Sequence, residues 1–407
     1  MTIAGLELRV LRLVGLCSLP FFLDCLIPAL MGPLAAPLST SLSLGRTELG
    51  AVFSANLVGQ CLGLLVVPLA TGRLGHRRII LWTTVGFGIS QGLTTFVDGR
   101  DMLVFSRFVT GVFLGGALPS CVAAVTQGTP PGKRGLATML LFTAFGLGGA
   151  VAGFYGSLFL EGEDWRYAFA TTGAACLVAA VMCALWLEEP PPETEPAVST
   201  GAGAPNPRAR VMDIVRPPLL GGTLLLWLMF VCALTIYYCL SSWLPTLLVQ
   251  NGWSLAAASR ATSLLAIGGL ATSFVASGLA DRGRIGLGIG GAYVIAAASL
   301  ALCATNPQGT VVWFVLLMLI GCSMGTAVTL GPVAAAHYPA DLRATGVGFA
   351  NGIGRIGSLF GPLALAALMN RQLSPPHVLG SLMVPLILCA LLIVWLSRVL
   401  SRETQRC

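Results

Sequence analysis

Long apolar segments alternate with short polar ones along almost the whole chain. Most of them hold about 20 residues, the length that a helix needs to cross a hydrocarbon layer about 30 Å thick. The pattern predicts twelve membrane-spanning helices and an all-α polytopic membrane fold. The predicted spans lie near residues 13–36, 48–70, 79–97, 102–127, 135–158, 166–187, 219–246, 256–280, 286–304, 311–336, 344–369 and 378–397.

Composition and charge support this interpretation. Of the 407 residues, 56% are hydrophobic and only 10% are charged, too few charges to cover the surface of a water-soluble protein of this size. The basic residues gather in alternate loops, and the positive-inside rule then places both termini in the cytoplasm. We therefore expect a multi-pass protein of the cell inner membrane, in contact with the lipid bilayer. The net charge of +7 needs no nucleic-acid partner.

A polar segment divides the chain into two similar halves. Residues 188–216 are rich in Pro, Ala and Glu and lack apolar periodicity, which indicates a cytoplasmic linker between six-helix halves at 1–187 and 217–407. Shifting the sequence by 209 residues places Arg134 on Arg343, and each arginine is followed by a glycine-rich helix. Parallel repeats of six helices, with the site at their interface, are a transporter architecture.

Two charged side chains are predicted near the middle of the membrane. Arg355 is twelve residues past Arg343, or roughly 18 Å into its helix at about 1.5 Å per residue. A guanidinium cannot lose its proton, so it must face a partner, a wet cavity or an anionic ligand. Asp24 lies at a similar depth, twelve residues past Arg12. Its carboxylate is either a proton-binding group or a structural group permanently paired with an arginine.

A second arginine, Arg107, lies within the fourth predicted span. Its depth below the outer surface is roughly 9 Å by the helix rise, and its long side chain could reach toward Asp24. Such a contact would be either a fixed structural pair or a proton-sensitive latch, and the sequence leaves both open.

Three further side chains are candidates for ligand contact. Asn351 precedes Arg355 by one helical turn, so the two side chains share a helix face. Tyr237 and Tyr238 lie deep in the seventh predicted span. Their rings either line a pocket for a planar ligand or pack in the ordinary way against neighbouring helices.

Several motifs form a recognisable pattern. The polar turns GRLGHRR and GLADRGR, the fourth-span segment RFVTGVFLGG and the 6+6 layout resemble the major facilitator superfamily. Within it, the segments SWLPTLL, YPADLRATGVG and GIGRIGSLFGP are similar to the aromatic acid/proton symporter family. The resemblance covers essentially the whole chain and implies a rocker-switch carrier with one central cavity.

The resemblance also implies roles for individual residues. Arg355 matches an eleventh-span arginine associated with the substrate carboxylate, and Arg107 matches an arginine near the proton path. Asp24 matches the first acid of a paired-acid motif, whose second acid falls at Ile27 here. The two polar turns match gating positions that hold the inner face closed. The gating residues expected in them are Arg73, Arg77, Asp281 and Arg282.

These features indicate a proton-coupled secondary active transporter that imports a small organic anion, an aromatic carboxylate above all, together with a proton. Two alternatives remain open, a proton-coupled exporter of hydrophobic or drug-like compounds and a carrier of a non-aromatic organic acid. An enzyme is disfavoured because His76, His337 and His377 are widely separated and form no catalytic or metal motif. We expect no metal and no cofactor. Because each chain contains a complete transport unit, we expect it to function as a monomer.

Overall fold

The computed structural model describes residues 2–3, 6–189, 212–280, 285–305, 309–339, 342–371 and 375–404. Twelve helical segments in these residues are long and apolar enough to cross a membrane. The predicted number of spans and the all-α membrane fold are therefore confirmed. The first span is longer than expected, because it runs from Leu8 to Ser41 and includes a second short helix.

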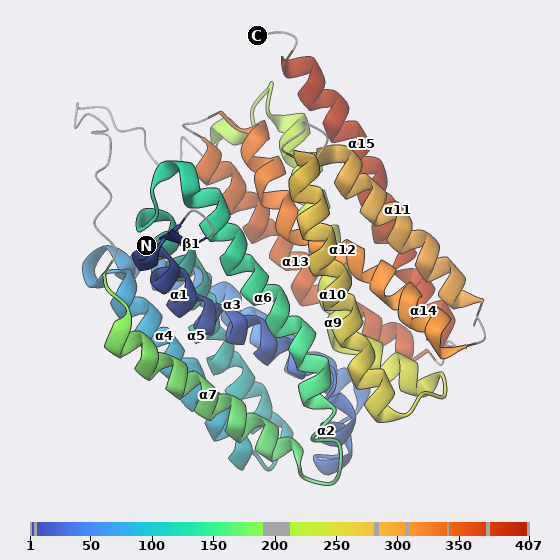
Figure 1. Ribbon diagram of the computed structural model, residues 1–407. Helices are drawn as coiled ribbons and strands as arrows, with labels where there is room; N and C mark the ends of the chain where they lie inside the picture. Colours follow the sequence, from blue (N-terminus) through green and yellow to red (C-terminus); the bar gives the residue numbers. More distant parts are fainter. Residues whose placement is uncertain are drawn as a thin grey trace. The chain divides into compact units, whose positions relative to one another are not determined.

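Figure 1 shows the helices coloured along the sequence, with those of the first half in blue to green and those of the second half in yellow to red. A short antiparallel ribbon that hydropathy did not predict, β1 (Thr2–Ile3) with β2 (Leu6–Glu7), precedes the first helix. The helices are α1 (Leu8–Leu30), α2 (Ala35–Ser41), α3 (Arg46–Leu74), α4 (His76–Leu93), η1 (Thr94–Phe96), α5 (Arg100–Gln127), η2 (Pro131–Lys133), α6 (Arg134–Gly156), α7 (Trp165–Trp186), α9 (Leu220–Gln250), α10 (Leu255–Ala280), α11 (Ile285–Ala304), α12 (Thr310–His337), α13 (Arg343–Met369), α14 (Pro375–Ser381) and α15 (Met383–Thr404).

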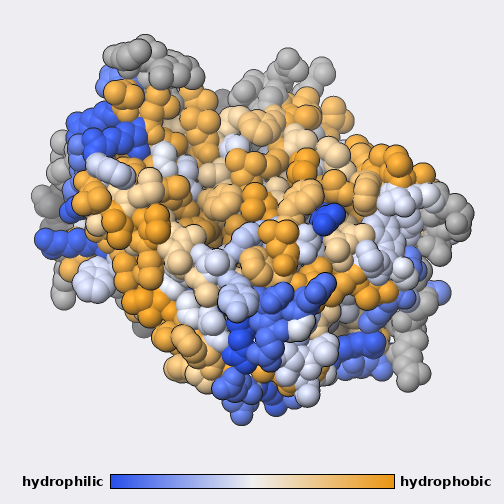
Figure 2. Space-filling view, turned by 60° about the horizontal axis from the view of Figure 1, so that its bottom comes forward, coloured by the Kyte–Doolittle hydropathy of each residue, from blue (hydrophilic) through white to orange (hydrophobic). Residues whose placement is uncertain are grey.

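Large apolar side chains cover much of the protein's exterior. Trp82, Phe105, Leu185, Val311 and Leu391 are all well exposed, although each belongs to a long apolar helix. Figure 2 shows hydrophobic residues spread over much of the face that it presents, with hydrophilic residues gathered in separate patches. Such an exterior is costly in water but suits lipid, where a helix satisfies its own backbone hydrogen bonds.

Residue contacts divide the chain into two compact units. The first unit contains residues Met1–Glu193 and Leu244–Ser263, and the second contains Thr194–Trp243 and Leu264–Cys407. In the first unit α3 packs against α5, α1 against α6, and α4 against both α5 and α7. In the second unit α11 packs against α12 and α15, and α12 packs against α13. The end of α9 and the beginning of α10 thus group with the first unit.

Glycines bring helix backbones together in the same way in both units. A Cβ atom added at Gly148 of α6 would overlap the backbone carbonyl of Phe22 on α1. A Cβ atom at Gly357 of α13 would likewise overlap the carbonyl of Val231 on α9, and both residues of this second contact lie 209 positions after those of the first. The repeated contact supports the proposal of parallel repeats, because small residues allow membrane helices to approach closely at defined positions.

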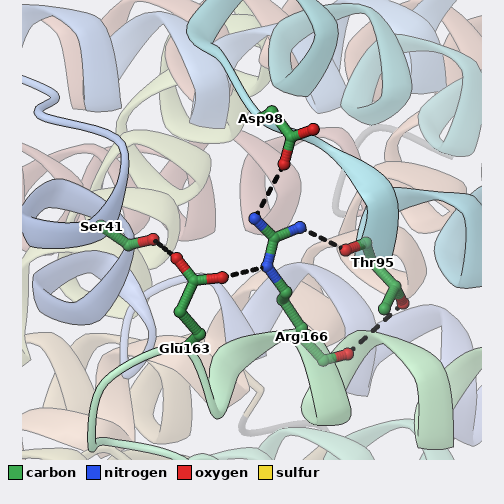
Figure 3. Close-up of polar contacts among 5 residues, drawn as sticks. All are labelled: Ser41, Thr95, Asp98, Glu163 and Arg166. Carbon is green, nitrogen blue, oxygen red and sulfur yellow. Dashed lines mark hydrogen bonds and ion pairs between the residues drawn. The ribbon is translucent and has the colours of Figure 1, made fainter.

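A cluster of polar contacts ties three loop regions of the first unit together (Figure 3). At its centre is Arg166, in the first turn of α7. Its guanidinium donates Nε to Glu163 Oε2 at 2.5 Å, Nη1 to the carbonyl oxygen of Thr95 at 2.6 Å and Nη2 to Asp98 Oδ1 at 2.9 Å. Ser41, at the end of α2, donates its hydroxyl to Glu163 Oε1 at 2.9 Å. The cluster therefore links the ends of α2, η1 and α7.

The Arg166 cluster predicts a pH-dependent contribution to stability. Hydrogen bonds from Arg166 and then Ser41 lower the pKa of Glu163. A lowered folded-state pKa stabilises the fold above the ordinary glutamate range, and this contribution is lost as pH falls through the lowered pKa. We expect Glu163→Gln to lower the apparent unfolding temperature slightly at pH 7, with the gap to wild type closing under acid. The exposed neighbour Glu161→Gln serves as control, and an equal shift in that variant would contradict the prediction.

Candidate functional site

The first group of candidate residues lies in the second unit, where α13 crosses α9. Arg355 of α13 is half-buried, and its Nη1 donates to the hydroxyl oxygen of Tyr238 on α9 at 3.3 Å. The rings of Tyr238 and Tyr237 lie edge to face with their centroids 5.1 Å apart. The Ser358 hydroxyl donates to the Arg355 carbonyl at 2.7 Å. The structure thus joins a membrane-embedded guanidinium to an aromatic pair that the sequence had singled out separately.

Glycine packing explains why Arg355 meets Tyr238. Gly354, Gly357 and Gly361 lie on the side of α13 that contacts α9. A Cβ atom at Gly354 would lie 2.9 Å from Cβ of Phe230, and one at Gly361 would lie 3.0 Å from the Thr235 methyl group. Because the two backbones approach this closely, a long side chain at the edge of the contact reaches the neighbouring helix.

Asn351 lies one turn before Arg355 on α13 and is exposed. Residues four apart on a helix share a face, so the amide and the guanidinium are presented on the same side of α13. An amide beside a guanidinium adds a neutral donor and acceptor next to a fixed positive charge. Asn351 thus remains a candidate for a second contact with a ligand.

Asp24 lies in α1 of the first unit and is almost fully buried, with 5% of its surface exposed. Its neighbours Leu23 and Ile27 belong to an apolar cluster of buried residues. Moving a carboxylate into such surroundings favours its neutral form unless a positive group compensates.

Arg107 of α5 is fully buried in the first unit, and its polar partners are neutral. Its Nη1 donates to Gln91 Oε1 at 2.8 Å, and its Nη2 donates to the Thr94 hydroxyl at 2.5 Å and to the Thr110 hydroxyl at 3.3 Å. The guanidinium also lies 4.8 Å from the ring centre of Phe169, a cation–π distance. No carboxylate in the described part of the chain forms an ion pair with it.

Sequence reasoning missed the partners of Arg107. Gln91 and Thr94 come from the end of α4 and from η1, and Gln91 is held in turn by a hydrogen bond of 2.9 Å to the Thr172 hydroxyl on α7. The signal was present in the polar run SQGLTT at 90–95, which is unusual at the end of an apolar helix. Buried polar residues in a membrane helix need partners, and here they satisfy one another.

Of the four predicted gating residues, the structure describes one side chain. Arg77 lies in the first turn of α4, where its Nη2 donates to the carbonyl oxygen of Ala184 at 2.7 Å. Its backbone N–H donates to the carboxylate of Glu189. Asp281, Arg282 and the side chain of Arg73 lie outside the described residues. The described residues contain no group of three or more His, Cys, Asp or Glu side chains placed to hold a metal ion.

Comparison with known proteins identifies the architecture. A model described as Major Facilitator Superfamily matches residues 17–362, well over half of the chain. The chain belongs to this superfamily. Two crystal structures share its fold. A bacterial homologue of the human lysosomal transporter Spinster aligns over 98% of this chain and 99% of its own, with a TM-score of 0.76 and 16% identity. A D-xylose–proton symporter aligns over 95% and 97%, with a TM-score of 0.75 and 15% identity.

Curated superfamily relatives include transporters of aromatic acids. A 4-hydroxybenzoate transporter of Pseudomonas putida is 30% identical over 92% of this chain and 89% of its own length. A 3-(3-hydroxy-phenyl)propionate transporter of Escherichia coli K12 is 30% identical over 87% and 86%. A gallate transporter of Pseudomonas putida is 27% identical over 93% and 90%. The predicted resemblance is confirmed, and the protein is a membrane transporter of this superfamily.

Proposed function

We propose that the protein imports a small aromatic carboxylate together with a proton. The observation that carries this proposal is the hydrogen bond from Arg355 to Tyr238, whose ring packs against that of Tyr237 in the second unit. A guanidinium binds a carboxylate through two parallel hydrogen bonds, a geometry that a lysine does not offer. Aromatic rings beside it give a planar substrate an apolar contact surface. The named substrates of the relatives, 4-hydroxybenzoate and gallate among them, combine a carboxylate with a ring.

Asp24 is proposed as the proton carrier. A buried carboxylate that takes up a proton becomes neutral, and moving a neutral group through the transport cycle avoids the cost of moving an uncompensated charge through a low-dielectric region. One proton carried with one carboxylate moves no net charge, so the pH difference across the membrane, and not the membrane potential, drives uptake. Arg107 lies near the beginning of α5 and is held by neutral partners. It is proposed to keep a fixed positive charge beside the proton path.

We also propose how the halves move, which residues gate the inner face and where the protein is located. The two six-helix halves at 1–187 and 217–407 would rock about a central site, and the polar turns with Arg73, Arg77, Asp281 and Arg282 would gate the inner face. Both termini would lie in the cytoplasm, with the protein in the cell inner membrane and active as a monomer. Repeated backbone contacts such as those at Gly148 and Gly357 support rigid halves, because closely packed helices move as one body.

Uptake of labelled acids into proteoliposomes tests the proposal. The panel contains 4-hydroxybenzoate, gallate, 3-(3-hydroxyphenyl)propionate and, as an aliphatic control, hexanoate. We expect uptake of at least one aromatic acid that depends on an inward proton gradient and stops when a protonophore is added. Asp24→Asn should lose gradient-driven accumulation while retaining exchange of substrate between the two sides. Accumulation that survives the protonophore, or efflux without uptake, would contradict the proposal and favour an exporter.

A further inference from the structure

A basic cavity lies at the end of the first unit where the beginnings of α1 and α4 meet the end of α7. It is open to the outside and has a volume of about 730 Å³, within the range of small-ligand pockets. Its basic lining comes from Arg12 on α1 and from Arg77 and Arg78 in the first turn of α4. Two acidic residues that follow α7, Glu188 and Glu189, also line it. The transport mechanism proposed above leaves Arg12 and Arg78 without a role.

The protein's own Glu189 shows how an anion binds there. Its carboxylate accepts the backbone N–H of Arg77, at 3.2 Å for Oε2 and 3.4 Å for Oε1. Gly75, just before α4, has a φ of 79°, and a Cβ atom there would lie 2.6 Å from Glu189 Oε1. The positive φ favours glycine at this position, and the Glu189 carboxylate lies against it. The start of α4 thus accepts an oxygen-bearing anion, and the helix dipole favours negative charge at the same point.

The donors in the cavity exceed what the two carboxylates use. The Nη2 group of Arg77 donates a hydrogen bond to the Ala184 carbonyl oxygen. Its Nε is buried with no hydrogen-bond partner in the described part of the chain. Glu188 pairs mainly with Arg9, at 3.3 Å, and only distantly with Arg12, at 3.9 Å. Arg78 forms no ion pair among the described residues. Three arginines that line one pocket suit a phosphate, which accepts more hydrogen bonds than a carboxylate.

Part of the cavity's rim is apolar and exposed. Leu185 and Trp186, at the end of α7, line it and are 67% and 48% exposed. Trp82 follows Arg78 by one turn of α4 and is also well exposed. Tryptophan at the end of a span is typical of the membrane interface, where a phosphate headgroup continues into acyl chains.

We propose that this cavity binds a phosphate group, supplied either by the headgroup of an anionic phospholipid or by a free phosphate, and that Glu189 occupies the phosphate position when the ligand is absent. Arg12, Arg78 and the α4 amide hold the phosphate oxygens. The exposed leucine and tryptophan side chains at the rim accept acyl chains when the ligand is a lipid. The site is independent of the proposed substrate group in the second unit.

Two binding measurements distinguish a phospholipid headgroup from a free phosphate. Native mass spectrometry of the purified full-length protein measures retention of dioleoylphosphatidylglycerol against dioleoylphosphatidylcholine, and calorimetry measures binding of inorganic phosphate. The test variant is Arg12→Gln/Arg78→Gln, and the matched control is Arg134→Gln, which removes an exposed arginine outside the cavity. We expect binding to weaken about fivefold for each lining arginine removed, and to stay unchanged in the control.

A preference for phosphatidylglycerol that the double variant loses supports a lipid headgroup, and phosphate binding that the double variant loses without any lipid preference supports a soluble phosphate. Glu189→Gln, which removes the competing carboxylate and keeps all the arginines, should strengthen binding of either ligand. The proposal is overturned if neither ligand binds, if the double variant binds as well as wild type, or if Arg134→Gln loses binding to the same extent.

Discussion

Replacing Arg355 by alanine should raise the apparent KM for aromatic acid uptake about 30-fold or more, because removing one partner of a hydrogen-bonded charge pair costs on the order of 2–5 kcal/mol. The reason is geometric as well as electrostatic, since the guanidinium stands beside the Tyr238 hydroxyl with its donors fixed by α13 packing against α9. Arg355→Lys keeps the charge but loses the planar group that forms two parallel hydrogen bonds with a carboxylate, so it should recover only part of the affinity. Initial uptake rates over a range of substrate concentrations give the KM of each variant.

Controls separate this effect from damage to the fold. Arg371→Ala removes an exposed arginine just after α13 and should leave the KM unchanged. Tyr238→Phe deletes one neutral hydroxyl, so we expect a change of only about 3–10-fold, in keeping with roughly 1 kcal/mol for such a hydrogen bond. If Arg355→Ala transports every acid in the panel with a KM near that of wild type, the carboxylate site lies elsewhere and the proposed function loses its main support.

Gly357→Ala should destabilise the protein by about 1–3 kcal/mol, the usual range for an extra methyl group forced into a packed interface. Its new Cβ would overlap the backbone carbonyl of Val231, and backbone cannot move aside as a flexible side chain can. Gly352→Ala, on the same helix, meets no atom within 4 Å and should be neutral or slightly stabilising. The apparent unfolding temperature of the detergent-purified protein measures this difference.

The first unit supplies a matched pair for the same test. Gly148→Ala would overlap the Phe22 carbonyl as Gly357→Ala overlaps that of Val231, whereas Gly135→Ala on the same helix meets no atom within 4 Å. We therefore expect Gly148→Ala to lower the unfolding temperature by a similar amount and Gly135→Ala to leave it near that of wild type. Equal behaviour of the close-packed and open glycines would show that these backbone contacts do not stabilise the protein.

Sequence reasoning reached the spans, the superfamily resemblance and most candidate residues because each depends on local information. A hydrophobic stretch must be long enough to cross the bilayer whatever surrounds it, so twelve spans follow from hydropathy alone. A charge in the middle of such a stretch is conspicuous for the same reason, which singled out Asp24, Arg107 and Arg355. The linker after α7 was equally visible, but the contact of Glu189 with α4 was not, because it joins segments 112 residues apart.

What the sequence by itself determined is where the chain crosses the membrane and which side chains it carries into the apolar region. The tertiary structure alone decided which of those side chains meet. Arg107 was within reach of Asp24 along the sequence pattern, yet its hydrogen bonds go to Gln91, Thr94 and Thr110. Arg355 meets Tyr238 because glycines let α13 approach α9. The physical reason is that hydropathy fixes the depth of a residue, whereas the rotation and neighbours of its helix are set by close packing between helices.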